Sequence, residues 1–347
     1  MLDIRHGLPE GFLGATARDL HRVLDGPTLI YLEGRREPPL FISALLHGNE
    51  DVGLLAVQRL LAEHAGQELP RSLVVFIGNV EAARHGVRRL AGEADYNRIW
   101  PGETGLTSPE ARMAAELTER MRREGLFASV DVHNNTGLNP HYGCINRLEP
   151  EFLQLAALFG RTGVYFRYPR GVQSLAFADI CPAITLECGK TGQEAGVDHA
   201  WEYLRACLHL SEIPDHPVAD HDLSLHHTVA RVTVPESVSF GFDDQDADIS
   251  FLGEIDQLNF RHLPPDTLFA RLNEQSGPCL RVLDEHGRDV SGRYFVCRDN
   301  ELRSCRPFMP SMLTRDETII RQDCLCYLME QYDWREDREA AQATGTS

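Results

Sequence analysis

The sequence predicts an α/β protein with a mostly parallel or mixed sheet flanked by helices, followed by a smaller C-terminal β domain. Up to about residue 210, apolar runs alternate with helical stripes, and after Pro214 short alternating strands separated by turn residues replace them. A length of 347 residues also exceeds what most single cores accommodate. We therefore expect one domain over residues 1–214, a β-rich domain over residues 215–333 and a disordered tail over residues 334–347.

Strands of the first domain should be covered on both faces, because their apolar runs are nearly continuous. These runs are 27–34, 39–46, 72–79, 128–133, 163–168 and 182–188. An apolar stripe predicts a helix from residue 51 to 65. Ser108 and Pro109 are typical of a helix N-terminus, and Gly125 is typical of its end. Further helices are expected over 151–159 and 198–210.

The second domain should consist mainly of short strands, which are expected within 228–236, 292–299 and 317–329. Two of its cysteines would share one face of the last strand. We favour buried free thiols over a cysteine-based zinc site, because free cysteines are common core residues. The cysteines concerned are Cys297, Cys305, Cys324 and Cys326. The pair His226-His227 is interpreted as a solvated linker.

The acidic composition argues against some partners. A net charge of −18, from 34 basic and 52 acidic residues, makes nucleic acid and an anionic membrane surface poor candidates. No apolar stretch approaches about 20 residues, and the first residues lack a signal-peptide pattern. Nine cysteines, an odd number, fit reduced thiols in the cytoplasm. A small anionic substrate stays compatible with the charge, because a local cluster of arginines can reverse its sign, and a homo-oligomer is equally compatible.

Polar residues stand at the carboxyl ends of three predicted strands. His47 and Glu50 follow one strand, His133 ends another, and Glu187 lies near the end of a third. Ligands bind at this edge of open α/β sheets. Two histidines and a carboxylate suit zinc and leave a coordination position for water. The remaining glutamate could act as a general base toward that water, whose pKa zinc lowers toward about 7.

Other polar residues lie between these strands. The loop 95–102 contains Asn97 and Arg98, which could hold an anionic substrate, because arginine offers two parallel donors to a carboxylate and asparagine adds a third. Arg88 and Arg89, just upstream, could polarise a carbonyl or stabilise an oxyanion.

Four motifs, in order and in approximate spacing, resemble the zinc carboxypeptidase clan. They are HGNE at 47–50, DYNR at 95–98, DVHNNTG at 131–137 and TLECG at 185–189. Within the clan, the chain is most similar to the succinylglutamate desuccinylase/aspartoacylase family, since a histidine followed by Asn-Asn-Thr is closer to aspartoacylases than to digestive carboxypeptidases. The resemblance covers roughly residues 27–210 and implies a zinc-carboxypeptidase-like fold.

The resemblance implies a role for each matching residue. One zinc ion per chain would be held by three ligands, namely His47, Glu50 and His133. Glu187 would be the base that activates water, and Asn97 with Arg98 would bind the substrate's α-carboxylate. Asp95 would fix the ring of a ligand histidine.

Three assignments from the resemblance are less direct. The segment before the Asp-x-Asn-Arg motif is one residue longer here than in the family. We choose Arg89 for the carbonyl-polarising role, with Arg88 as the alternative. Arg170 is a candidate for the arginine that determines substrate specificity. Tyr165 lies at about the distance from Glu187 at which carboxypeptidases have a tyrosine.

Three functions therefore compete. The first is a zinc-dependent hydrolase that cleaves the amide bond of an N-acyl amino acid, with the β domain narrowing access to the pocket. The second is a zinc carboxypeptidase that removes C-terminal residues from peptides, which Tyr165 would favour. The third is a metal-binding module without catalysis, and the presence of Glu187 argues against it.

Overall fold

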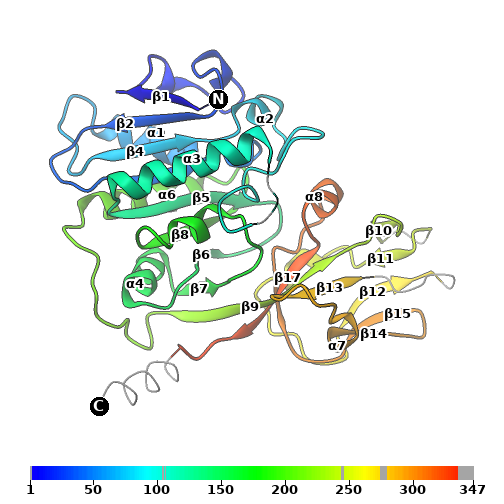
Figure 1. The fold of residues 1–347 in the computed structure, drawn as a ribbon. Coiled ribbons are helices and arrows are strands. Elements are labelled where there is room, and N and C mark those ends of the chain that lie inside the picture. Colours follow the sequence, from blue (N-terminus) through cyan, green and yellow to red (C-terminus); the bar gives the residue numbers. More distant parts are fainter. Residues whose placement is uncertain (1, 104, 106, 244–245, 274–279, 335–347) are drawn as a thin grey trace. The chain divides into compact units, whose positions relative to one another are not determined.

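A computed structural model describes residues 2–103, 105, 107–243, 246–273 and 280–334. The chain forms two compact units (Figure 1). Unit 1 comprises residues 1–134 and 141–224, and unit 2 comprises residues 135–140 and 225–347. Residues 215–224, which the sequence analysis assigned to the β domain, group with unit 1. The predicted tail lies outside the described residues from 335 onward.

Unit 1 is built on a mixed sheet, which confirms the predicted α/β class. Strand β3 (Leu40–Ala44) pairs in parallel with β4 (Leu73–Ile77) and with β5 (Ala128–Asn135), whereas β2 (Thr28–Leu32) is antiparallel to β4. The order is β1-β2-β4-β3-β5-β8-β6-β7. The remaining strands are β1 (Asp3–His6), β6 (His141–Ile145), β7 (Thr162–Tyr165) and β8 (Ala183–Lys190).

The predicted helices of unit 1 are present, with ends within a few residues of the expected ones. They are α1 (Val52–Glu63), α3 (Pro109–Glu124), α4 (Pro150–Phe159) and α6 (Glu194–His209). Four short elements were not predicted from the sequence, namely β1, β6 and the helices α2 (Val80–His85) and α5 (Gln173–Phe177). These elements are so short that a period of 2 or 3.6 residues has little room to show. Two single 3₁₀ turns, Phe12–Gly14 and Leu20–Arg22, precede β2.

The two faces of the sheet in unit 1 have different coverings. On one face, Phe41 of β3 lies 4.7 Å from Phe177 of α5 between ring centroids, and Trp100 packs edge-on against Phe177. On the other face, α1 begins at β5, where the N–H of Val52 donates to Oδ1 of Asn134 over 3.2 Å, and α6 packs against α1. Figure 1 shows α3 in front of the sheet of this unit, running roughly along its strands. Since side chains alternate along a strand, odd-numbered residues of β3 and β5 point to the first face.

Unit 2 is rich in short strands. One five-stranded sheet has the order β10-β11-β12-β15-β14, and β17 pairs antiparallel with both β9 and β16. Its core includes the packed rings of Phe269, Phe295 and Phe308. The strands are β9 (Ser224–Thr233), β10 (Phe240–Phe242), β11 (Ile249–Phe251), β12 (Leu268–Leu272), β13 (Arg281–Asp284), β14 (Phe295–Arg298), β15 (Glu301–Ser304), β16 (Met309–Ser311) and β17 (Cys326–Gln331). The helical turns are η3 (Ile255–Leu258), α7 (Ser291–Tyr294) and α8 (Glu317–Gln322).

Two predictions for unit 2 were wrong. The first half of the stretch 317–329 is the helix α8, because the side chain of Asp316 accepts a hydrogen bond from Ile319 N over 3.1 Å and so caps a helix start. His226-His227 is part of β9, where His226 is buried and His227 lies 3.3 Å from the carboxylate of Glu285. A histidine pair next to a polar turn can belong to a strand that pairs with sequence-distant partners, and that pairing is not visible locally.

The cysteines of unit 2 do not come together as a metal site in the described residues. Cys324 and Cys326 are buried, and Cys324 precedes β17 rather than lying in it. Cys297 and Cys305 are exposed, so the expectation of buried thiols was wrong for these two residues. Burial raises the pKa of the Cys326 thiol well above its usual value, which favours an inert thiol.

The N-terminus of α3 provides a test of the fold. Oγ of Ser108 accepts a hydrogen bond from Ala111 N over 3.1 Å. Ser108→Ala should therefore lower the free energy of unfolding by about 1 kcal/mol, whereas Ser108→Asp should retain most of it, because aspartate is an equally good capping residue. Urea unfolding followed by circular dichroism measures both. Equal midpoints for Ser108→Ala and the wild type would contradict the capping role.

Candidate metal centre and its surroundings

The turn after β3 places two of the predicted metal ligands. A Cβ atom on Gly48 would lie 2.2 Å from the backbone of Ala82 and Ala83, so only glycine lets this turn pack against α2. Gly48 N also donates to the carbonyl oxygen of Arg88 over 3.1 Å. His47 and Glu50 are held on either side of this glycine, both buried. Close packing against α2 therefore explains why the HGNE motif has a glycine at position 48.

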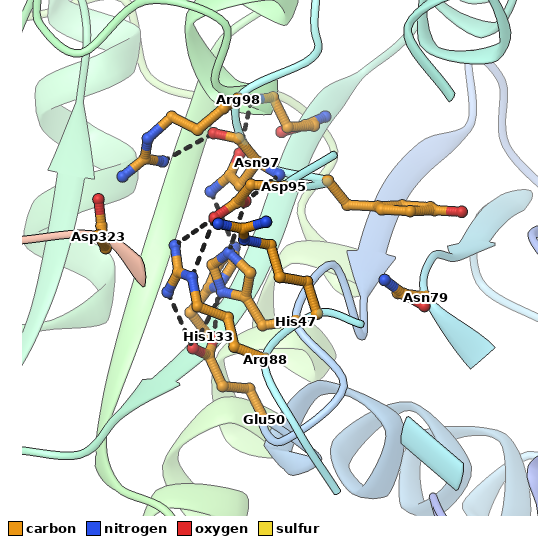
Figure 2. A network of polar contacts seen from close by, with 12 residues as sticks. His47, Glu50, Asn79, Arg88, Asp95, Asn97, Arg98, His133 and Asp323 are labelled. Carbon is orange, nitrogen blue, oxygen red and sulfur yellow. Dashed lines mark hydrogen bonds and ion pairs between the residues drawn. The ribbon is translucent and has the colours of Figure 1, made fainter. Parts of the chain in front are cut away.

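His47, Glu50 and His133 form a buried cluster whose ligand atoms lie within 4.8 Å of one another (Figure 2). Nδ1 of His47 lies 2.9 Å from Oε1 of Glu50, and Nδ1 of His133 lies 2.7 Å from Oε2. The two imidazoles thus approach opposite oxygens of one carboxylate. In the described part of the chain, this is the group of His, Cys, Asp and Glu side chains that could hold a metal ion.

The outer nitrogen of each imidazole also contacts a carboxylate. Nε2 of His47 lies 3.1 Å from Oδ1 of Asp95, as the sequence analysis expected of Asp95. Nε2 of His133 lies 2.8 Å from Oδ2 of Asp131, whose other oxygen accepts from Ser43 Oγ over 2.6 Å. Such contacts fix the tautomer and the ring plane of metal-binding histidines. Asp131 was not among the residues predicted from the sequence, although its position two residues before His133 puts both side chains on one face of β5.

Electrostatics keep Glu50 ionised although it is buried. Burial alone would raise the pKa of the Glu50 carboxyl, but the charges of His47 and His133 lower it far below its usual range. Burial disfavours a charged His133 ring, yet Asp131 and Glu50 raise the pKa of His133 well above its usual value. The cluster is therefore a set of opposite charges that compensate one another out of water.

Asp95 joins the cluster to an arginine. Nε and Nη2 of Arg88 lie 3.0 and 2.9 Å from Oδ2 of Asp95, and Nη1 lies 3.9 Å from Oε1 of Glu50. Burial would raise the pKa of Asp95, but Arg88, His47 and Arg98 hold it well below its usual range. Arg88 is itself buried. A positive group is thus fixed at one side of the cluster.

Arg89, the residue chosen from the sequence for the carbonyl-polarising role, makes a different contact from Arg88. Its Nη1 donates to the carbonyl oxygen of Glu93 over 2.8 Å. Oε2 of Glu93 in turn accepts from Leu90 N over 2.9 Å and from Asn79 Nδ2 over 2.8 Å. These bonds close the segment 90–93 into a small loop. It is Arg88 that the structure brings to the cluster.

Asn97 and Arg98 lie beside the cluster, as their motif implies. Nδ2 of Asn97 is 3.4 Å from Nε2 of His133, and Asn97 N donates to Oδ1 of Asp95 over 2.8 Å. Nη1 of Arg98 donates to the carbonyl oxygen of Asn97 over 2.7 Å, and Arg98 is partly exposed. Figure 2 shows both side chains next to His133 and Asp95. The amide of Asn97 and the guanidinium of Arg98 are therefore two hydrogen-bond donors beside the cluster.

Glu187 is buried on β8, the neighbour of β5. Ser129 N donates to the carbonyl oxygen of Pro182 over 2.9 Å, so the two strands begin side by side and run in the same direction. Glu187 and His133 therefore occupy corresponding positions near the ends of their strands. Burial, together with the charges of Glu187 and Asp131, raises the pKa of the Cys144 thiol well above its usual value.

Two further candidates lie in other elements of unit 1. Tyr165 is half-buried at the end of β7, and Arg170 is exposed in the loop before α5. This loop reaches the segment 97–100, because Gly171 O accepts from Trp100 N over 3.0 Å. The roles of Tyr165 and Arg170 stay predictions.

Comparisons with known proteins agree with these observations. A family model for the succinylglutamate desuccinylase/aspartoacylase catalytic domain matches residues 36–196. Succinylglutamate desuccinylase of Pseudomonas paraeruginosa is 38% identical over 111 residues, which are 30% of this chain and 32% of that protein. The alignment thus spans about a third of that relative's length.

Solved structures share the fold over most of the chain. The succinylglutamate desuccinylase of Chromobacterium violaceum has a TM-score of 0.56 at 20% identity, covering 86% of this chain and 86% of that one. Murine aminoacylase 3 has a TM-score of 0.50 at 16% identity, covering 86% of this chain and 97% of that one. At sequence identities of 20% and 16%, this similarity shows a shared fold and nothing more.

A buried His-Glu-His cluster near the carboxyl ends of strands in an α/β sheet is a set of side chains that could hold a metal ion. Residues 36–196, which carry all four motifs, match the model of the succinylglutamate desuccinylase/aspartoacylase catalytic domain. Within the described residues, no helix is long and apolar enough to span a membrane.

The contact of Asp131 with His133 provides a test of the cluster. Asp131→Asn should weaken zinc binding by about ten- to a hundredfold, because the ring loses the carboxylate that orients it and raises its basicity. Competition with a chromophoric chelator measures the dissociation constant. Ser43→Ala, which leaves the Asp131 carboxylate in place, should change the constant less. An unchanged affinity in Asp131→Asn would exclude this role.

Proposed function

We propose that the protein is a zinc-dependent hydrolase that cleaves the amide bond of an N-acyl amino acid. The observation that carries the proposal is the buried group of His47, Glu50 and His133, set beside the buried Glu187 in a domain of this family. Two histidines and one carboxylate are a donor set that zinc accepts. The carboxylates on the outer ring nitrogens support this fit.

One zinc ion would be held by His47, Glu50 and His133. When bound, the ion would act as a Lewis acid toward the carbonyl oxygen and would lower the pKa of coordinated water toward about 7. The remaining chemistry belongs to side chains of this chain.

Glu187 acts as general base and then as general acid. Its carboxylate takes a proton from the attacking water and returns it to the leaving nitrogen, so the amide bond breaks with a neutral amine as leaving group. Its burial near the end of β8 excludes bulk water, which would otherwise compete for the proton. The position beside β5 supports this role, because β5 carries His133.

Arg88, rather than Arg89, polarises the scissile carbonyl in this proposal. Its guanidinium is buried, is fixed by Asp95 and lies 3.9 Å from Glu50, so it is preorganised next to the cluster. A fixed positive group of this kind stabilises an oxyanion without reorganising. The guanidinium of Arg89 instead binds the backbone of Glu93.

Asn97 and Arg98 hold the α-carboxylate of the substrate. Both are donors beside the cluster, and Arg98 is partly exposed, so a substrate can reach it. We infer a small anionic substrate, because Arg88 and Arg98 give a positive side to this region of an acidic protein. The free cysteines of the described residues suit the cytoplasm.

Replacement of Glu187 tests the mechanism. Glu187→Gln should bind zinc as the wild type does and lower kcat by several orders of magnitude, because the amide cannot accept the proton. A panel of N-acetyl and N-succinyl amino acids, set against short peptides with free C-termini, measures turnover of the zinc-loaded protein. Turnover of the peptides alone would reassign the chain to the carboxypeptidases. Retained turnover in Glu187→Gln would remove this residue from the mechanism.

The adjacent arginines form a matched pair of variants. Arg88→Lys should lower kcat/KM by about a hundred- to a thousandfold, because lysine cannot reproduce the two bonds to Asp95 and loses the fixed donor. Arg89→Lys should stay within a fewfold of the wild type. Steady-state kinetics on the best substrate of the panel compares them, with melting temperatures as the check on folding. The reverse order of effects would return the role to Arg89.

A further inference from the structure

Gln173, the first residue of α5, connects the Asn97 loop to the central sheet. It is 0% exposed. Its backbone N–H donates to Oδ1 of Asn97 over 3.0 Å, and its side-chain Nε2 donates to Oγ of Ser129 over 2.9 Å. Ser129 lies on β5, on the face that carries Asp131 and His133. One residue therefore contacts both a substrate-binding loop and the strand of a metal ligand.

The segment before Gln173 is also fastened to the Asn97 loop. Trp100 N donates to the carbonyl oxygen of Gly171 over 3.0 Å. Gly171 has φ +74, and a Cβ atom there would lie 2.6 Å from the carbonyl oxygen of Arg98. The two backbones thus run in close contact. A shift of Gln173 would be passed directly to residues 97–100.

The hydrogen bond from Gln173 N decides how the amide of Asn97 is turned. A carboxamide has an accepting oxygen and a donating NH₂ group of nearly the same shape. Because a backbone N–H occupies one side of Asn97, the oxygen must face it, and a flipped amide would set two donors against each other. Nδ2 is therefore directed toward His133, at 3.4 Å from Nε2.

We propose that Gln173 is a positioning residue that holds the loop of Asn97 and Arg98, the two residues proposed to bind the substrate's carboxylate, in place against β5. The proposal rests on the function proposed above, in which Asn97 binds that carboxylate. It adds the residue that holds Asn97 in its working orientation. Gln173 acts through Asn97 and is not itself a catalytic residue.

A second feature of Gln173 argues against a purely stabilising role. Its Oε1 is buried and has no hydrogen-bond partner among the described residues. A buried carbonyl without a partner is unfavourable for the folded state. An apolar side chain of similar length would avoid this loss. The amide group therefore contributes position, through its bond to Ser129, more than stability.

Gln173→Met separates the two roles. Methionine keeps the length and the burial, and it removes both the donor to Ser129 and the unpaired oxygen. We expect KM to rise about three- to tenfold, which corresponds to the loss of one ordinary hydrogen bond, with kcat within about twofold and an unchanged or higher melting temperature.

Ser174→Ala is the matched control. Ser174 is the next residue of α5, is 0% exposed, and its Oγ has no partner in the described part of the chain. Its removal should leave KM unchanged. A double-mutant cycle completes the test, since Gln173→Met should add nothing to the KM effect of Asn97→Ala if it acts through Asn97.

Binding is measured separately from turnover. In the zinc-loaded Glu187→Gln background, calorimetry with the best-hydrolysed member of the panel should show the same three- to tenfold loss of affinity on adding Gln173→Met. A lower melting temperature with unchanged KM and affinity would overturn the proposal and leave a structural role. A KM effect that persists in full in Asn97→Ala would also overturn it.

The failure of this inference is distinguishable from the failure of the proposed function. If the wild type neither binds nor hydrolyses any N-acyl amino acid, the proposed function falls and this inference falls with it. If the wild type hydrolyses them and Gln173→Met behaves like Ser174→Ala, only the role of Gln173 is wrong.

Discussion

The buried carboxylate of Glu50 is the constraint on which the site depends. A carboxylate with 6% exposure cannot stay ionised without compensation. His47 and His133 provide it from opposite sides, at 2.9 and 2.7 Å. The end of β3, the start of α1 and the end of β5 must therefore stay in register. Gly48 makes this register sterically feasible by letting the turn lie against the backbone of α2.

Around this centre, each polar group serves more than one neighbour. Oδ1 of Asp95 receives both Nε2 of His47 and the N–H of Asn97, while Oδ2 receives the guanidinium of Arg88. Through Asp95, the orientation of the His47 ring is coupled to the placement of the residues proposed to bind substrate. Gln173 extends the same network to Ser129 on β5. Buried networks of this kind are rigid because every lost partner leaves an unpaired polar group.

Much of this arrangement could be predicted from the sequence. Strands that are buried on both faces show as apolar runs, and the residues after them fall at one edge of a parallel sheet. Asp131 could have been found as well, from its spacing to His133. Local signals failed where elements are short, as in β6 and α5, and where a capping residue outweighed a strand-like pattern, as at Asp316 before α8.

The sequence by itself determined the α/β class, most helices and strands of unit 1, and the chemistry of the candidate ligands, because periodicity and residue type are local properties. The tertiary structure decided which of two adjacent arginines meets the cluster. Glu93 closes the loop after Arg89 with help from Asn79, and this contact depends on the fold rather than on local preference. It also decided that Gln173 lies against Asn97, across 76 positions of chain. Such contacts form between segments that only packing brings together, so neighbouring residues carry no trace of them.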